Sequence, residues 1–183
     1  MGKVIILGGN ARSGKTTLSS KLRGHGFTHI SFDCLYDFMK EALNINVDEM
    51  PHEEKMKILK YIINKVKDDD ESYVLDMYDF LPKDLVEYND IDNLEIYFLA
   101  YPNCTKEEIK FNVINYAKPT DWIAQVNEEY LNECVERFDK RNKLLLDECE
   151  KYNMNLIDTK SGKDRDTVLN DLYKKIINDV RKR

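Results

Sequence analysis

Eight residues close to the N-terminus have the types and the spacing of a phosphate-binding loop, G-x-x-x-x-G-K-[ST]. They are Gly9, Asn10, Ala11, Arg12, Ser13, Gly14, Lys15 and Thr16. A loop of this pattern turns its backbone N–H groups toward the α- and β-phosphates of a nucleotide. Lys15 would bind the β- and γ-phosphates, and the hydroxyl of Thr16 would ligate Mg²⁺. These residues, together with Thr17 directly after them, therefore predict a nucleoside triphosphate site.

The segments on either side of this loop predict the elements that must position it. Residues 3–8 form a mostly apolar run typical of a buried strand, and Leu18 and Leu22 give a helix over residues 14–24 one apolar face. The N-terminus of that helix would direct about half a unit of positive charge at the same phosphates. Strand, glycine loop and helix follow one another as the motif requires, so an ordinary Gly/Ser turn is the disfavoured interpretation.

Two aspartates stand where predicted strands end. Asp33 follows a strand over residues 28–32, and Asp76 follows a strand over residues 73–75. Ligands of open α/β sheets bind at the carboxyl ends of the strands, so both side chains are expected to face the loop. A carboxylate there can hold Mg²⁺ through water or accept a proton from an attacking hydroxyl. We assign Asp76 the role of magnesium ligand and Asp33 the role of general base. A magnesium-binding role for Asp33 remains open, as does a helix-cap or turn-cap role for either aspartate.

The arginines are distributed unevenly along the chain. After Arg23 none occurs until Arg137, and Arg141 follows four residues later on the same predicted helical face. Two guanidinium groups on a helical segment are suited to stabilising a phosphoryl group in transfer. The alternative is an exposed face on which the two arginines pair with Glu133 and Glu136.

The segment after the second predicted strand bears on the molecule that would accept a phosphoryl group. Residues 34–70 contain lysines but no arginine. An acceptor phosphate is typically bound by bidentate arginines, so the absence favours an acceptor that presents a hydroxyl, with Asp33 as its base. Lysines can also bind phosphate, and a phosphate-bearing acceptor is therefore disfavoured rather than excluded.

Composition narrows the class of protein further. The chain has 183 residues and a formal net charge of −6, which disfavours a nucleic-acid partner. Its apolar runs are too short to span a bilayer, and a strand beginning at residue 3 leaves no room for a leader, so we expect a cytoplasmic protein without a membrane partner. Four scattered cysteines predict reduced thiols rather than zinc or disulfides: Cys34, Cys104, Cys134 and Cys149. Nothing in the sequence predicts the oligomeric state.

Predicted strands and helices alternate along the chain, which is typical of a parallel sheet covered on both faces. The strands are expected at residues 3–8, 28–32, 73–75, 94–99 and 155–157. Residues 120–152 depart from this alternation, because they are predominantly helical and contain no strand. A segment this long without a strand is typical of a functional insertion.

With these features in order, the whole chain resembles the small P-loop kinases, a group that includes adenylate kinase, shikimate kinase, gluconate kinase and the uridine kinase-like enzymes. The resemblance implies a single kinase domain over residues 1–183, with a three-layer α/β P-loop fold. Its parallel sheet would have five strands in the order 2-3-1-4-5. The resemblance also implies an acceptor-binding helical region near residues 34–70 and a helical lid near residues 118–142.

Shorter segments carry the same resemblance. Asp33–Tyr36 looks like the aspartate-bearing end of strand two in the members that phosphorylate hydroxyls, and Val74–Asp76 looks like their strand-three segment. In such kinases the loop after the last strand lies against the adenine. The resemblance therefore places three residues near the adenine: Asp158, Thr159 and Ser161.

The sequence as a whole predicts an ATP- and Mg²⁺-dependent phosphotransferase that acts on a small hydroxyl-bearing metabolite or nucleoside. Lys15 and the loop amides would hold the triphosphate, with Asp33 as base and Asp76 at Mg²⁺. Arg137 and Arg141 would close over the phosphoryl group. Two alternatives remain, a nucleoside monophosphate kinase and a nucleotide-binding regulatory ATPase without an acceptor. The identity of the acceptor and the choice between ATP and GTP stay open.

Overall fold

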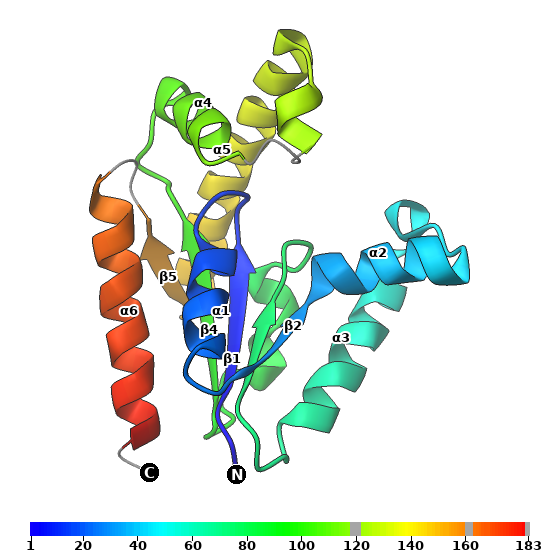
Figure 1. The fold of residues 1–183 in the computed structure, drawn as a ribbon, viewed down its shortest axis with the longest axis vertical. Coiled ribbons are helices and arrows are strands. Elements are labelled where there is room, and N and C mark those ends of the chain that lie inside the picture. The colour runs from blue at the N-terminus through cyan, green and yellow to red at the C-terminus, as the bar shows by residue number, and fades with distance from the viewer. Residues whose placement is uncertain (118–121, 160–162, 182–183) are drawn as a thin grey trace.

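A parallel sheet of five strands, in the order β2-β3-β1-β4-β5, forms the centre of the computed structural model (Figure 1). The structure describes residues 1–117, 122–159 and 163–181. The strands are β1 (Val4–Gly9), β2 (Thr28–Ser31), β3 (Tyr73–Asp76), β4 (Leu94–Ala100) and β5 (Asn155–Asp158). This architecture confirms the predicted α/β class and strand order.

Helices connect the strands and cover both faces of the sheet. They are α1 (Lys15–Arg23), α2 (Phe32–Leu43), α3 (His52–Val66), α4 (Lys106–Asn115), α5 (Glu128–Lys151) and α6 (Lys163–Arg181). Short 3-10 helices lie between them in the described ranges: η1 (Val47–Glu49), η2 (Pro82–Asp84), η3 (Val86–Tyr88) and η4 (Trp122–Gln125). No helix in the described part of the chain is both long enough and apolar enough to cross a bilayer.

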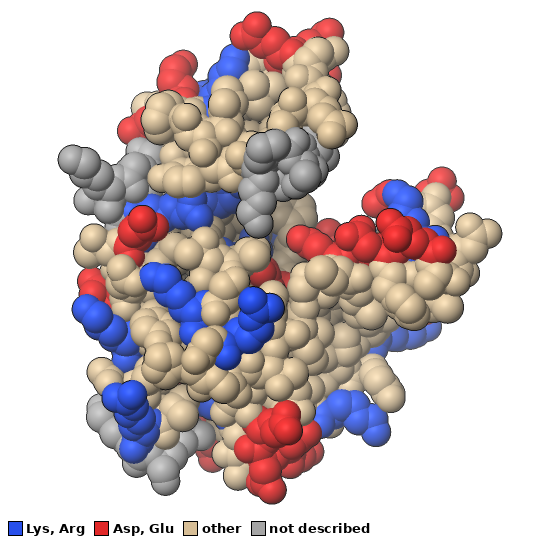
Figure 2. Space-filling model, viewed as in Figure 1, with Lys and Arg blue, Asp and Glu red and all other residues tan. Residues whose placement is uncertain are grey.

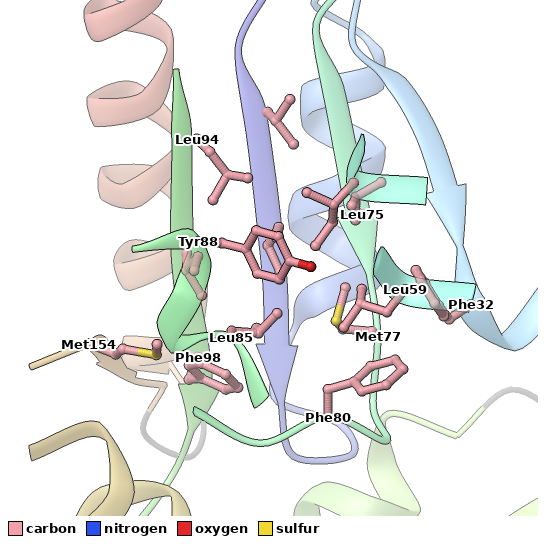
Figure 3. Packing of buried hydrophobic residues seen from close by; sticks show 14 of the residues in the cluster. Phe32, Leu59, Leu75, Met77, Phe80, Leu85, Tyr88, Leu94, Phe98 and Met154 are labelled. Carbon is pink, nitrogen blue, oxygen red and sulfur yellow. The ribbon is translucent and has the colours of Figure 1, made fainter. Parts of the chain in front are cut away.

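Strand β1 is buried along its whole length because it contributes to a core on each face of the sheet. Ile5 and Leu7 pack with residues of α1 and α6, whereas Val4 and Ile6 pack with residues of α3 and α5. Figure 3 shows part of this second core. Burying one such side chain stabilises the fold by about 1.5–3 kcal/mol. A central strand buried on both faces appears in the sequence as a continuous apolar run.

The part of the molecule beyond the carboxyl ends of the strands is built by α4 and the first half of α5 (Figure 1). A third apolar cluster joins them, with Ile109 and Val113 of α4 packed against Val135 and Phe138 of α5. Helix α4 begins with a capping box between Thr105 and Glu108.

Most of the predicted lid, residues 118–142, belongs to this outer part. Residues 118–121 lie outside the described residues. From Glu128 onward the segment is one helix with the part of α5 that covers the sheet. That the outer segment acts as a lid stays a prediction.

The second strand is shorter than predicted, and this changes the position of Asp33. Strand β2 ends at Ser31, and α2 begins at Phe32. The Ser31 hydroxyl accepts a hydrogen bond from the backbone N–H of Cys34 at 3.3 Å, so serine caps the helix. The expected alternative, in which Asp33 is the cap, is wrong. Asp33 lies in the first turn of α2, at the same edge of the sheet.

Candidate nucleotide and acceptor site

The loop between β1 and α1 has a backbone that two of its glycines make possible. Gly9 has φ 126°, and a Cβ atom there would lie 2.1 Å from the Leu99 carbonyl oxygen. Gly14 has φ 100° and stands directly before α1, whose first turn receives no side-chain cap from it. Any other residue would be strained at both positions. The first N–H groups of α1 therefore face the loop, as an anion site requires.

Buried hydrogen bonds fix the loop to the rest of the molecule. The Asn10 amide donates to the Phe138 carbonyl at 2.7 Å and to the Asn142 side-chain oxygen at 2.8 Å. The backbone N–H of Tyr101 donates to the same Asn142 oxygen at 3.2 Å. The Tyr101 hydroxyl donates to the carbonyl of Ala11 at 2.7 Å. The loop is thus held by α5 and by the residue that follows β4.

Lys15 is the first residue of α1, directly after the loop, and its side chain is buried. Its ammonium group donates a hydrogen bond to the carbonyl of Asn10 at 2.8 Å. Burial lowers the pKa of Lys15 from its ordinary value, and the carboxylates of Asp76 and Asp33 oppose that shift. The Nζ atom is also 5.8 Å from the centroid of the Tyr78 ring. Lys15 therefore shares one partly desolvated site with both predicted aspartates.

A hydroxyl and a carboxylate meet beside Lys15. The Thr16 hydroxyl donates to Oδ2 of Asp76 at 3.2 Å, and Asp76 is buried. His29 Nε2 lies 3.9 Å from the same oxygen, and burial lowers the pKa of His29. Hard oxygen donors suit Mg²⁺, which usually keeps several waters and phosphate oxygens as its other ligands. The pair therefore fits Mg²⁺, although no three His, Cys, Asp or Glu side chains in the described ranges could hold a metal by themselves.

Asp33 is solvent-exposed at the beginning of α2. Its pKa is raised because neighbouring protein atoms remove part of its hydration and because the Asp76 carboxylate repels its negative charge. The ammonium group of Lys15 opposes this shift. The structure thus brings Asp33 within electrostatic range of the loop, as the sequence predicted. A raised pKa makes the ionised carboxylate a stronger base.

The two arginines of α5 have different surroundings. Arg141 is partly buried, and its guanidinium lies 4.2 Å from the centroid of the Tyr78 ring. It donates hydrogen bonds to the carbonyls of Tyr78 and Phe80. Burial lowers the pKa of Arg141. Arg141 therefore reaches the residues that follow β3, and its charge acts on Lys15.

Arg137 is exposed one turn earlier on α5. Its guanidinium donates to Sγ of Cys134 at 3.1 Å, and a hydrogen bond with the Tyr130 side chain raises the pKa of Arg137. Its charge also acts on the phenol of Tyr78. The charges of both arginines thus act on Tyr78, but only Arg141 lies over its ring and is partly buried.

Two of the residues expected near the adenine are described: Asp158 ends β5, and Thr159 follows it. Thr159 is buried, and both its backbone N–H and its hydroxyl donate to the Ala100 carbonyl, at 2.7 and 3.1 Å. Asp158 accepts a hydrogen bond from Asn103 at 2.7 Å. Ser161 lies outside the described residues. A contact of Thr159 with a nucleotide base stays a prediction.

Sequence reasoning missed an arginine that borders the loop, Arg165 of α6. Its guanidinium lies 4.2 Å from the centroid of the Tyr116 ring, and Nη2 is 3.5 Å from the Thr17 hydroxyl. Its Nε and Nη1 atoms are buried without a hydrogen-bond partner among the described residues. Arg12 donates to the carbonyl of the same tyrosine at 3.4 Å. The sequence did contain one indication of this position. A cation in the first turn of a helix is unfavourable beside the helix dipole, so Arg165 is expected to have another interaction that stabilises its charge.

No family model matches the sequence, and no curated protein matches it. Solved structures do match. A gluconokinase from Sinorhizobium meliloti 1021 has a TM-score of 0.55 and 13% identity, covering 97% of this chain and 97% of that one. A shikimate kinase from Bacteroides thetaiotaomicron has a TM-score of 0.57 and 18% identity, covering 95% of this chain and 98% of that one. The chain has the fold of the small P-loop kinases.

A further structure with this fold is a shikimate kinase from Acinetobacter baumannii in complex with shikimate. Its TM-score is 0.57 at 14% identity, and the match covers 97% of this chain and 95% of that one. In the small P-loop kinase fold of this chain, the loop, Asp33 and Asp76 all lie at the carboxyl ends of the strands.

Proposed function

We propose that this protein is a kinase that transfers the γ-phosphoryl group of ATP, with Mg²⁺, to a hydroxyl of a small molecule. The observation that carries the proposal is the electrostatic grouping of Lys15, Asp76 and Asp33 at the end of the loop. A phosphate-binding loop alone would fit any nucleotide-binding protein. A carboxylate with a raised pKa beside the loop also provides a base for an attacking hydroxyl.

Each residue has a separate part in the proposed reaction. Lys15 exchanges the Asn10 carbonyl for phosphate oxygens, and the loop N–H groups bind the same phosphates. Thr16 and Asp76 would hold Mg²⁺, which supplies positive charge to the phosphate oxygens. Asp33 orients the acceptor hydroxyl and takes its proton.

The acceptor side of the site favours a hydroxyl over a phosphate. Lys55 is a cation there, but its ammonium group is 2.8 Å from Asp79 in an ion pair. Residues 34–70 supply no arginine to bind a second phosphate. A nucleoside monophosphate kinase is therefore the weaker alternative. A regulatory ATPase has no acceptor hydroxyl, so it would not need a general base at the position of Asp33.

The test is release of ADP from ATP and Mg²⁺ in the presence of sugars, nucleosides and nucleoside monophosphates. We expect at least one hydroxyl-bearing class to accelerate release about tenfold or more over hydrolysis alone, because a positioned base contributes about a hundredfold or more. Acceleration by monophosphates alone would favour the second kinase class. Slow release that no acceptor changes would contradict the proposal and favour the regulatory ATPase.

The surroundings of the two α5 arginines predict unequal effects on turnover. Arg141→Ala should lower kcat about a hundredfold, because it removes a partly desolvated charge beside the loop. Arg137→Ala should change kcat less than about fivefold, because the side chain is exposed. Lys140→Ala, an exposed cation between them, is the matched control. Equal losses in both arginine variants would show that the two act as the pair that the sequence predicted.

A further inference from the structure

The guanidinium of Arg165, in the first turn of α6, faces the end of the phosphate-binding loop. A Cβ atom placed on Gly14 would lie 3.3 Å from Nε of Arg165, and Nη2 donates to the Thr17 hydroxyl at 3.5 Å. Gly14 stands directly before α1, and Thr17 lies in its first turn. Arg165 therefore extends from α6 to the beginning of α1.

Two nitrogen atoms of this guanidinium have no acceptor in the protein. Nε and Nη1 are buried, and neither donates a hydrogen bond to a residue that the structure describes. Buried N–H groups are almost always paired, because a donor that loses its hydration without gaining an acceptor costs free energy. A ligand that brings oxygen atoms to this position would accept from them.

The surroundings of Arg165 are electropositive. It takes part in none of the ion pairs between described residues. The first turn of α1, against which it lies, contains no acidic side chain, and the unpaired N–H groups there carry about half a unit of positive charge. The charge of Arg165 also reaches the loop, where with Arg12 it opposes the rise that burial causes in the pKa of Tyr101. Because like charges repel, a bound anion would stabilise this arrangement.

The place of Arg165 in the fold indicates which phosphate of a nucleotide it would meet. In Figure 1, α6 and α2 lie on opposite sides of α1. Figure 2 shows basic side chains at the level of the loop, between the beginning of α6 and a notch that α2 borders. The γ-phosphoryl group must face Asp33 of α2 for transfer, and Lys15 binds the β- and γ-phosphates. The triphosphate then extends toward α6, with its α-phosphate beside Arg165.

The atoms that lack acceptors favour a phosphate over a nucleotide base. The Tyr116 ring already covers one face of the guanidinium, with its centroid 4.2 Å from Cζ of Arg165. A base would stack on a face of the guanidinium and leave the Nε and Nη1 donors unpaired. Phosphate oxygens accept hydrogen bonds from guanidinium N–H groups and carry the opposite charge.

We infer that Arg165 binds the α-phosphate of the nucleotide and that Tyr116 positions its guanidinium. The inference rests on the proposed function, because it needs a nucleotide in the loop. The α-phosphate keeps its bonds while the γ-phosphoryl group is transferred, so Arg165 stabilises the bound substrate and the transition state equally. Such a contact lowers KM for ATP without raising kcat. Arg165 thus differs from Arg141, whose loss is expected to lower kcat.

Direct binding measures this contact without turnover. The ligands are ATP, ADP and methyl triphosphate, which lacks ribose and base, each titrated with Mg²⁺ at equal ionic strength. Arg165→Ala should weaken all three by the same factor, about tenfold or more, because all three have an α-phosphate. Arg181→Ala, which removes an exposed arginine from the last turn of the same helix, is the matched control and should change each affinity less than about twofold.

A double-mutant cycle tests the positioning role of Tyr116. Tyr116→Ala should weaken ATP and ADP equally, whereas Tyr116→Phe keeps the ring over the guanidinium and should restore their affinities. In a protein that already lacks the Arg165 side chain, Tyr116→Ala should cause no further loss, because it acts through Arg165. Additive losses in the double variant would contradict this role.

Thermal unfolding without nucleotide separates binding from a purely structural role. Arg165→Ala should unfold at the wild-type temperature or above it, because its buried nitrogens gain nothing from the protein. A lower unfolding temperature with unchanged nucleotide affinity would overturn the inference.

The pattern of losses separates the remaining outcomes. A loss confined to ATP would place Arg165 at the γ-phosphate, and a loss that spares methyl triphosphate would place it at the ribose or base; either result overturns the inference. If no acceptor accelerates ADP release but Arg165→Ala weakens all three ligands, the kinase proposal fails and the inference stands. If the wild-type protein binds none of the three ligands, both fail.

Discussion

Replacing Lys15 with alanine is expected to lower turnover at least about a hundredfold and to weaken triphosphate binding. The ammonium group is buried, and its hydrogen bond to the Asn10 carbonyl keeps it in the loop. A charge in a partly desolvated site interacts with phosphate far more strongly than a charge in water. No other lysine in the described part of the chain belongs to the loop, so its contribution would not be replaced. ADP release and titration with the triphosphate measure the two effects.

The matched control for this variant is Lys57→Ala on α3. Lys57 is 71% exposed and pairs with Glu54 of the same helix. Its loss should leave turnover within about twofold, because exposed ion pairs contribute little. Thermal unfolding of both variants would establish that the fold is intact. Turnover of the Lys15 variant close to wild type would overturn the assignment of the loop to the reaction.

Replacing Asp33 with asparagine is the second large effect. We expect transfer to fall by about a hundredfold to ten-thousandfold while ATP binding stays close to wild type. The carboxamide keeps the shape of the side chain but cannot accept a proton. Asp33 is exposed in the first turn of α2, where a negative charge stabilises a helix by only about 0.3–1 kcal/mol, so the fold should tolerate the change. Single-turnover transfer and a separate ATP titration distinguish chemistry from binding.

The pH profile provides a second measurement for the same residue. The raised pKa of Asp33 means that the carboxylate is protonated, and lost as a base, at a higher pH than an ordinary aspartate. Wild-type kcat/KM should therefore fall as the pH decreases through this raised pKa. The asparagine variant should lack that acidic limb. An identical limb in both proteins would assign it to another group and remove Asp33 from the role of base.

The sheet could be predicted because its strands are buried in a way that the sequence displays. A strand such as β1, covered on both faces, has to be apolar throughout, and this pattern needs no knowledge of distant residues. The end of β2 could not be placed as well. Phe32 continues the apolar pattern, but the Ser31 hydroxyl accepts a hydrogen bond from the Cys34 N–H and caps α2, so β2 ends one residue earlier than predicted. A side-chain cap outweighed the hydrophobic pattern.

Some residues of the candidate site could likewise be placed from the sequence, and others could not. Residues 9–16 are contiguous, so their arrangement is local and the motif predicts it. Asp76 could be located because a strand end has a fixed place in a parallel sheet. The sequence could not predict three further residues of the site, because their positions depend on how distant helices and loops pack against the phosphate-binding loop: Tyr78, Asn142 and Arg165. The spacing of Arg137 and Arg141 indicated a shared face but not which side chain would be partly buried against Tyr78.

The hydrogen bonds between Asn10 and α5 have a mechanical consequence. The side-chain amide of Asn10 donates hydrogen bonds to the carbonyl of Phe138 and to the side chain of Asn142, so this stretch of α5 is fixed to the phosphate-binding loop. Any rotation of the outer end of α5 must then pivot at this stretch or break two buried hydrogen bonds. A nucleotide that displaces the loop would move this pivot and tilt the outer end of the helix. By the same linkage, a force applied to that outer end would change the affinity of the loop for its nucleotide.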